Sequence, residues 1–391
     1  MQNQDIEMIL YFCYFTACGV HQTIPDVSNI GKAELANLYS FGKAHSLTAL
    51  IYNTLECSNA FAAYPELKEK WKSDRDNSIR KNILLDAQRK RLEAFLTENK
   101  IWYVPLKGSM IRAFYPKFEM RQMSDCDILF DSNFRHAVKE YFENCGYTVK
   151  SYSTTCHDKY MKPPVYNFEM HVSLFNSLYK PHWNEYFDNI HSRLIKAQSG
   201  SYEYKMTDED FYLYFIAHSG KHYNECGIGL KFLVDLYFIL KNYDERLDWS
   251  YVSEKLRYLE LDDFEKTAKS LCTKLFDSPV SVDKSCLDDA ELEMLRYISK
   301  CGTYGVKTNK YKNEFKRIDN SGSGSTKRKY YISRLFPDKG WYLLNCPFCA
   351  KHVWARPFYT CWRVIRAVLF RREKIKKEYK IISSSCDTSK S

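Results

Sequence analysis

Three acidic side chains near the middle of the chain are of the type and spacing that can hold divalent cations. Asp125 and Asp127 flank Cys126 at the start of an apolar run, and Glu169 lies within a later apolar segment. Side chains two residues apart on a strand share a face and lie roughly 7 Å apart. Two carboxylates at this spacing can bind a pair of cations about 3.5 to 4 Å from each other. A charge on an apolar strand is costly to bury without a metal or an ionic partner, so Glu169 is a third candidate ligand.

A Gly-Ser pair precedes these carboxylates, in the order that a phosphate-binding site requires. Residues 102–106 predict a short strand, Lys107, Gly108 and Ser109 predict a turn, and residues 110–114 predict the start of a helix. Such a turn presents free backbone N–H groups and the positive end of the helix dipole, and the glycine permits close approach of a ligand. A Gly-Ser turn or an Asp-x-Asp pair alone is most often only a turn or a solvated strand edge. Their combination favours a site for a nucleotide and metal ions.

The elements that must position these residues predict an α+β protein. Apolar residues recur every three or four positions in the first hundred residues and again in the second half of the chain, which predicts helices on both sides of a few short strands. Strands are expected at residues 102–106, 126–130, 147–152 and 165–172. Helices are expected at residues 5–20, 32–55, 76–99, 133–144, 208–222, 228–242, 251–259 and 288–300.

This order predicts a small mixed-sheet core framed by N- and C-terminal helical regions. The expected parts are an N-terminal helical region at 1–100, the α/β core at 101–205, a helical region lining the cleft at 206–316, and a connector with a basic C-terminal segment at 317–391. The connector is expected to be flexible because residues 320–326 are rich in Ser and Gly.

A family resemblance is carried by residues 106–129. They read Leu-Lys-Gly-Ser at 106–109, Tyr-Pro at 115–116, Arg121, and Ser-Asp-Cys-Asp-Ile-Leu at 124–129. This segment resembles the motif of the uncharacterised bacterial nucleotidyltransferases of the polymerase-beta-like superfamily. That motif combines a Gly-Ser turn, an Asp-x-Asp strand and a third carboxylate on a neighbouring strand. The resemblance extends more weakly over most of the chain, through Ala44-His45, His218 and His222, Asp235, and Leu335-Phe336-Pro337.

The resemblance implies transfer of a nucleoside monophosphate from an NTP to an acceptor, with release of pyrophosphate. Asp125 and Asp127 would hold two Mg²⁺ (or Mn²⁺) ions, and Glu169 would help activate the acceptor hydroxyl as a metal ligand or a base. His171 follows Glu169 by two residues and shares its strand face, so it could share or replace that role. The third ligand is therefore either Glu169 or His171.

The resemblance also assigns the nucleotide-binding residues. Gly108 and Ser109 would bind the β- and γ-phosphates, while Lys107 and Arg121 would stabilise the negative charge of the triphosphate. The nucleotide and an unidentified acceptor are thus the expected partners.

Two histidines at helical spacing have two interpretations. His218 and His222 lie one turn apart, as in His-Glu-x-x-His metalloproteases, but Ser219 stands where that motif has its glutamate. They are either core or interface histidines, or they face the cleft and contact the acceptor or the nucleotide. Lys221 and Asp235 could join them.

The positive charge is concentrated at the C-terminal end. Residues 351–391 contain eleven Lys and Arg and three acidic residues, and therefore carry +8 of the net charge of +10. The nearly neutral remainder gives no basic groove, so nucleic acid is not an expected partner. Residues 358–382 mix apolar and basic side chains. They could lie on an anionic membrane surface, or pack on the body with the basic end in solvent.

The cysteines and the N-terminus predict a cytoplasmic protein. The 14 cysteines are scattered through a long chain, which indicates reduced thiols. Residues 8–20 are apolar but too short to span a bilayer, and acidic residues precede them where a signal peptide has positive charge. If the basic segment binds a membrane surface, the protein would be membrane-associated.

Two functions remain from different classes. The first is a metal-dependent nucleotidyltransferase whose acceptor is a small molecule, a glycan precursor or a protein. The second is a catalytically inactive nucleotidyltransferase-like module that binds a partner or a membrane surface.

Overall fold

The computed structural model describes residues 2–176, 180–319, 326–337 and 339–370, and seven positions between 372 and 382. Most of the expected connector at 320–326 lies outside the described residues, as do Arg371, Lys374 and Lys377 of the basic segment. Two compact units make up the chain. The first comprises Met1–Gly220 and Ile228–Thr303, and the second comprises Lys221–Gly227 and Tyr304–Ser391.

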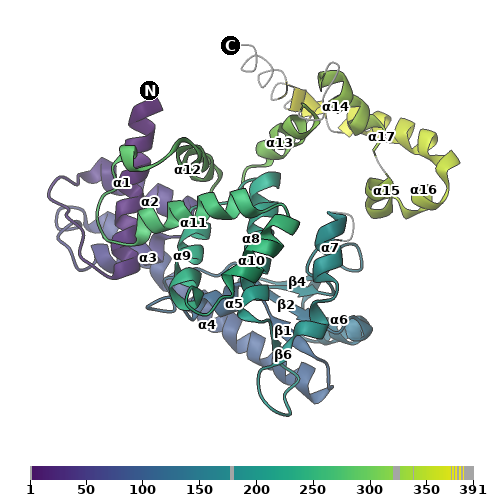
Figure 1. Cartoon of the computed structure of the whole chain (residues 1–391), viewed down its shortest axis with the longest axis horizontal. Coiled ribbons are helices and arrows are strands. Elements are labelled where there is room, and N and C mark those ends of the chain that lie inside the picture. The colour runs from purple at the N-terminus through teal and green to yellow at the C-terminus, as the bar shows by residue number, and fades with distance from the viewer. Residues whose placement is uncertain are drawn as a thin grey trace. The chain divides into compact units, whose positions relative to one another are not determined.

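The first unit contains a mixed five-stranded sheet with the order β1-β2-β5-β4-β3 (Figure 1). Its strands are β1 (Tyr103–Pro105), β2 (Cys126–Phe130), β3 (Thr148–Ser151), β4 (His157–Lys162) and β5 (Tyr166–His171). The central pair, β2 and β5, is parallel, whereas β1 pairs with β2, and β4 pairs with both β3 and β5, in the antiparallel sense. A separate two-stranded sheet joins β6 (Ile195–Lys196) and β7 (Tyr204–Lys205). The expected α+β class with a small mixed sheet is confirmed.

One face of the five-stranded sheet forms a hydrophobic core. Cys126, Ile128 and Phe130 alternate along β2 onto this face, and they pack with residues from α4 and α6, including Leu92, Leu96, Val138 and Phe142. Because successive side chains of a strand point to opposite faces, Asp125 and Asp127 lie on the other face. The core therefore fixes the strand that presents the two carboxylates.

Helices surround the sheet in the first unit. Those before β1 are α1 (Gln2–His21), α2 (Lys32–Ala44), α3 (Thr48–Leu55) and α4 (Pro65–Glu98). Those between β1 and β6 are α5 (Gly108–Arg112), α6 (Arg135–Asn144), α7 (Pro181–Phe187) and the 3₁₀ turns η1 (Ser132–Phe134) and η2 (Ile190–Arg193). Those after β7 are α8 (Asp208–Glu225), α9 (Lys231–Tyr243), α10 (Trp249–Tyr258), α11 (Asp262–Phe276), η3 (Lys284–Cys286) and α12 (Asp289–Cys301).

The expected helices differ from the observed ones in several places. The single helix expected at 32–55 is two helices, because Ser46 adopts a left-handed backbone with φ 55° between α2 and α3. The helix expected at 76–99 begins eleven residues earlier, at Pro65. Elements of the first unit that the sequence pattern did not predict include α7, α11 and β4.

Helix α4 holds the segment that leads into β2. Asn82 donates hydrogen bonds to the carbonyls of Phe118 and Arg121, at 2.9 and 3.2 Å, and Ser78 donates to the carbonyl of Glu119 at 2.9 Å. Both side chains are buried, so these bonds satisfy backbone groups that have no sheet partner. This explains why polar residues occupy the inner face of a helix that the sequence predicts to be apolar there.

The second unit consists of short helices. They are α13 (Lys307–Asp319), α14 (Thr326–Leu335), α15 (Lys339–Asn345), α16 (Pro347–Lys351), η4 (Val353–Ala355) and α17 (Arg356–Phe370). Two small apolar clusters hold them, one around Tyr342 and Cys349 and one around Phe315 and Tyr330. Within the described part of the chain, we find no helix that combines the length and the apolar character needed to cross a membrane.

Candidate active site

The parallel pairing of β2 and β5 brings the predicted acidic residues together. Asp127 and Glu169 are direct partners in the strand register, and Asp125 immediately precedes β2 on the same face as Asp127. His171 shares the face of Glu169, and its Nε2 lies 3.1 Å from Oδ1 of Asp127. Ligand atoms of Asp127, Glu169 and His171 all lie within 4.8 Å of one another. These three residues could hold a metal ion.

Lysine side chains neutralise two of the carboxylates. The ammonium of Lys107 lies 3.5 Å from Oδ2 of Asp127, and that of Lys159 lies 2.8 Å from Oε1 of Glu169. Burial raises the pKa of Asp127, but the charge of Lys107 and the hydrogen bond to His171 outweigh burial, so this pKa lies well below its usual range. Asp127 is therefore an anion throughout the physiological pH range.

Asp125 has the opposite electrostatic environment. Burial is the largest effect on this carboxyl, followed by the negative charges of Asp127 and Glu169, and together they raise its pKa. Lys107 and a hydrogen bond from Ser124 oppose this rise only in part. The site thus crowds like charges on Asp125, which is the arrangement that a bound cation would relieve.

A thiol and a second histidine lie beside His171. Burial lowers the pKa of His171, but contacts with Asp127 and Cys156 outweigh it and raise the pKa to about 9. Burial raises the pKa of Cys156, whereas His157 and His171 lower it, to about 6. Ligand atoms of Cys156, His157 and His171 also lie within 4.8 Å of one another. His171 is therefore shared between an oxygen-rich group and a sulfur-containing group.

The predicted Gly-Ser turn leads from β1 into α5. Lys107 has a positive φ of 29°, and the helix begins at Gly108. A Cβ atom at Gly108 would lie 2.8 Å from Cε of Met123 and 3.2 Å from Nη1 of Arg121. The absence of a side chain at Gly108 therefore lets Arg121 and Met123 lie close to the turn. Ser109 is partly buried at the first turn of α5.

Arg121 is buried and faces an aspartate. Its Nε and Nη2 donate to the two carboxylate oxygens of Asp235 at 2.8 and 2.9 Å, and Tyr115 donates to the same carboxylate at 2.6 Å. The remaining Nη1 donates to the carbonyl of Gly108 at 3.2 Å. In this structure Arg121 supports the Gly108 turn through this hydrogen bond. Its expected contact with the triphosphate stays a prediction.

The two helix histidines differ in what the structure shows of them. His218 of α8 contacts the site, because its Nε2 lies 2.8 Å from the ammonium of Lys107. His222 lies one turn further along α8 and belongs to the second unit. The structure therefore places His218 beside Lys107. A contact of either histidine with the nucleotide or the acceptor stays a prediction.

A family profile described as an uncharacterised nucleotidyltransferase matches residues 31–277. The chain belongs to this family. The matched region contains α2 to α11 and therefore the strands and turns that build the site. No match was found among curated proteins or among solved structures. The family resemblance inferred from residues 106–129 is thus confirmed.

Sequence reasoning missed several charged residues of this nucleotidyltransferase family member. Lys159 lies on β4, whose inward positions include the buried Asp158, so the alternation of apolar and polar residues was hidden. Asp158 is paired with Arg135 through two bonds of 2.6 Å. Lys81 of α4 and Lys231 of α9 donate to the carbonyls of Ser124 and Gln122, just before Asp125. Single basic residues in amphipathic helices carry no signal for such roles.

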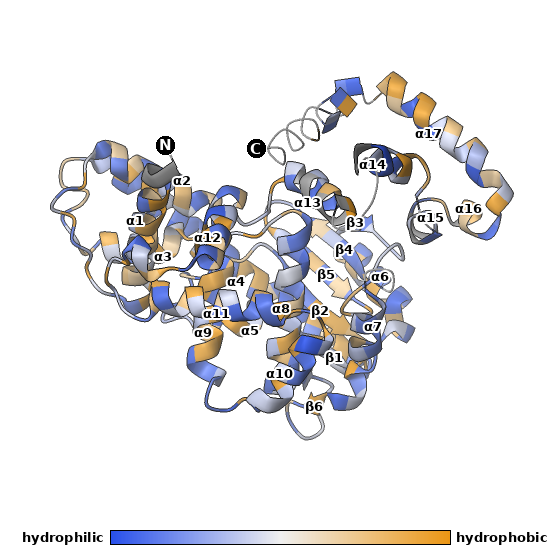
Figure 2. Ribbon diagram, turned by 45° about the horizontal axis from the view of Figure 1, so that its top comes forward, coloured by the Kyte–Doolittle hydropathy of each residue, from blue (hydrophilic) through white to orange (hydrophobic). Residues whose placement is uncertain are grey.

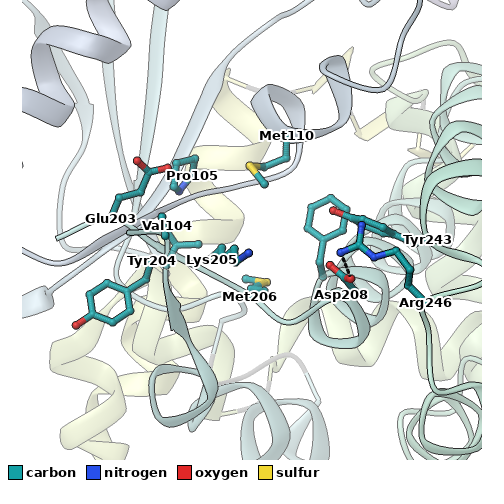
Figure 3. Close-up of a pocket in the computed structure, with 12 residues that line it drawn as sticks. Val104, Pro105, Met110, Glu203, Tyr204, Lys205, Met206, Asp208, Tyr243 and Arg246 are labelled. Carbon is teal, nitrogen blue, oxygen red and sulfur yellow. Dashed lines mark ion pairs between the residues drawn. The ribbon is translucent and has the colours of Figure 1, made fainter. Parts of the chain in front are cut away.

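A cavity of about 210 Å³ lies apart from the carboxylates (Figure 3). Its apolar wall includes Val104, Pro105 and Met110, and its polar lining includes an ion pair between Asp208 and Arg246. None of the three acidic residues lines it. Because Pro105 and Met110 bracket the Gly108 turn, the cavity adjoins the turn from the side of β1 and β7.

Proposed function

We propose that the protein is a metal-dependent nucleotidyltransferase that transfers a nucleoside monophosphate from an NTP to an acceptor, with release of pyrophosphate. The observation that carries the proposal is the pairing of Asp127 with Glu169 across two parallel strands, with Asp125 on the same face. Membership of a nucleotidyltransferase family supports the same reaction class. The acceptor is a small molecule, a glycan precursor or a protein.

The donor set suits a hard divalent cation. Carboxylate oxygens are the ligands that Mg²⁺ and Mn²⁺ prefer. The site offers Asp127 and Glu169, whose ligand atoms lie within 4.8 Å of each other, and Asp125 lies on the same face. The raised pKa of Asp125 supports this fit, since its cause includes the like charges of the other two carboxylates. When bound, Mg²⁺ would neutralise developing charge on the transferred phosphoryl group and favour the ionised form of the acceptor hydroxyl.

The neighbouring residues have distinct roles in this proposal. The backbone N–H groups at Gly108 and Ser109 bind the β- and γ-phosphates, because they begin α5, which only two residues separate from the end of β1. Lys107 stands between Asp127 and His218 and contributes positive charge where the triphosphate meets the carboxylates. Arg121 positions the turn through the carbonyl of Gly108.

Glu169 and His171 divide the remaining task. Glu169 is the better metal ligand or base for the acceptor hydroxyl, because its carboxylate is partly exposed. Its oxygens face the side chains of Lys159 and His157. His171 is buried and donates to Asp127, which orients that carboxylate. The third carboxylate of the motif is therefore assigned to Glu169, and His171 is assigned as a positioning residue.

A second candidate is the inactive nucleotidyltransferase-like module. The observation that favours it is the neutralisation of the carboxylates by the protein's own cations, Lys107 on Asp127 and Lys159 on Glu169. A module that no longer binds metal would keep its fold with such pairs. The thermal-unfolding experiment described next distinguishes the two candidates.

The test is thermal unfolding with each NTP, with and without Mg²⁺. A ligand at about 100 times its dissociation constant adds roughly 2.7 kcal/mol to the free energy of unfolding, which raises the melting temperature. We expect a Mg²⁺-dependent rise for the wild type and none for Asp127→Ala. Asp263→Ala, which removes an exposed carboxylate from α11, is the matched control and should respond as the wild type does. No rise with any NTP would favour the inactive module, and an equal rise in Asp127→Ala would overturn the proposed site.

A further inference from the structure

Helix α17 packs through a face rich in polar groups and exposes an apolar face. Arg356, Tyr359, Thr360 and Arg363 lie at the spacing of one helix face and make the contacts with the rest of the second unit. Arg356 donates to the carbonyl of Cys349 at 3.0 Å, and the guanidinium of Arg363 lies 4.1 Å from the ring centre of Trp341. Thr360 is buried and lies 3.4 Å from the hydroxyl of Tyr342. The packed face is thus rich in polar groups.

The opposite face is apolar and exposed. Phe358, Trp362, Ile365 and Leu369 are spaced by four, three and four residues, so they form one row along α17. Their side chains are 72, 49, 58 and 61% exposed. Figure 2 shows hydrophobic and hydrophilic residues alternating along α17. A helix whose apolar side packed within the second unit would turn this row inward, so the contacts of this unit leave the row available to a partner.

Further exposed apolar residues precede this row in the chain. Phe348 is in α16, and Val353 and Trp354 are in η4, and all three are more than half exposed. Monomeric soluble proteins rarely expose apolar side chains in continuous groups, and such groups mark interaction surfaces. We refer to Phe348, Val353, Trp354 and the row on α17 as the apolar face of the second unit.

The charge of the segment selects the partner. Residues 339–372 contain no Asp or Glu, and Arg366 and Arg372 are exposed beside the apolar residues. The guanidinium of Arg366 lies 5.1 Å from the ring centre of Trp362, so this cation lies next to the apolar row on α17. A second copy of the chain would bring like charges together on this face. An anionic lipid surface offers both the negative charge and an apolar interior.

We propose that the apolar face of the second unit binds an anionic membrane surface, with α17 lying in the plane of the interface. Helices of this kind bury their apolar face about 5 to 10 Å into the boundary between headgroups and acyl chains, and Trp is favoured at that depth. Arg366 and Arg372 contact the lipid phosphates. The inference is independent of nucleotide transfer, because it uses no residue of the catalytic proposal.

The test is sedimentation of the full chain with vesicles of phosphatidylcholine alone and of phosphatidylcholine mixed with phosphatidylglycerol. We expect binding to the mixed vesicles that weakens as salt is added. The double variants Ile365→Glu/Leu369→Glu and Ile365→Ser/Leu369→Ser should both lose binding, the second without any change of charge. Arg366→Ala should weaken binding about fivefold, the effect of removing one interfacial cation.

The controls change equally exposed apolar residues of the first unit. Ile83→Glu and Val280→Glu, at side chains 55 and 58% exposed, should bind as the wild type does. No binding of the wild type to the mixed vesicles, or undiminished binding of both double variants, would overturn the proposal. Light scattering that shows a dimer lost in Ile365→Ser/Leu369→Ser would instead place a second copy on this face, and salt-sensitive capture by an acidic polypeptide with no vesicle binding would place a protein there.

Discussion

Two buried groups of charges lie within the first unit and differ in how they are paired. Around Asp235, each carboxylate oxygen accepts hydrogen bonds from a dedicated donor of Arg121 or Tyr115. Around Asp125, Asp127 and Glu169, three anions share a face, and Asp125 has its pKa raised by its neighbours. A fully paired group stabilises a fold, whereas crowded like charges are tolerated where they serve chemistry. The following variants test that difference.

Asp127→Asn should have the largest effect, and the effect should fall on activity. Loss of a metal ligand removes several kcal/mol of transition-state stabilisation, so NTP turnover with Mg²⁺ should fall roughly a thousandfold. The melting temperature without nucleotide should fall modestly, because the amide loses the ionic contacts with Lys107 and His171 that lower the pKa of Asp127. Retained turnover would show that the chemistry lies elsewhere.

Asp235→Ala should have the next largest effect, and it should fall on stability. It leaves the buried Arg121 without its partner, which costs about 3 to 5 kcal/mol of the free energy of unfolding. Denaturant unfolding measures this loss. The double variant Arg121→Met/Asp235→Leu serves as the control and should recover most of it, because apolar residues replace both charges. A fully stable Asp235→Ala protein would refute the role given to this pair.

Lys231→Met should change the pH dependence of stability. Burial and the charge of Arg121 lower the pKa of Lys231 to about 7, below its value in the unfolded chain. The unfolded state then binds more protons between about pH 7 and 10.5, so this lysine makes the wild type less stable below pH 7 than at pH 9. Melting temperatures of the variant relative to the wild type should therefore be higher at pH 6 than at pH 9. A difference independent of pH would show that Lys231 is charged throughout this range.

Lys159→Met should have the smallest effect on stability. Its ion pair with Glu169 is partly exposed, and such pairs contribute about 0 to 1 kcal/mol. The variant removes a cation that competes for the carboxylate, so the Mg²⁺ concentration that gives half of the NTP-induced thermal shift should fall severalfold. Lys139→Met, at another partly exposed ion pair on α6, is the control and should leave it unchanged. If Lys159→Met needed the same Mg²⁺ concentration as the wild type, Glu169 would not be a metal ligand.

The sequence predicted local elements well where the pattern was regular. β2 has the expected bounds, because its apolar residues are flanked by the Asp-x-Asp motif. The carboxylates and the turn are predicted as a candidate site for the same reason, since their spacing is local. The expected bounds failed where one residue with a left-handed backbone, Ser46, breaks a continuous apolar pattern.

Long-range partners could not be predicted. Asp235 lies 114 residues beyond Arg121, so nothing local indicated that this arginine was already paired. The partnership of Asp127 with Glu169 depends on β3 and β4 lying outside β5, and β4 was not recognised. Spacing along the chain thus identified which residues can do chemistry, and the strand order decided which of them meet.

The strand order also sets when the site assembles during folding. β3, β4 and β5 form an antiparallel meander of neighbouring segments, whereas β2 joins β5 only by closing the chain over the residues between them. Contacts between distant segments cost more loop-closure entropy and form more slowly than local ones. The meander can therefore form first, with Glu169 paired to Lys159 within it. Repulsion among the three carboxylates then arises only as β2 docks, when most of the surrounding contacts already hold the chain in place.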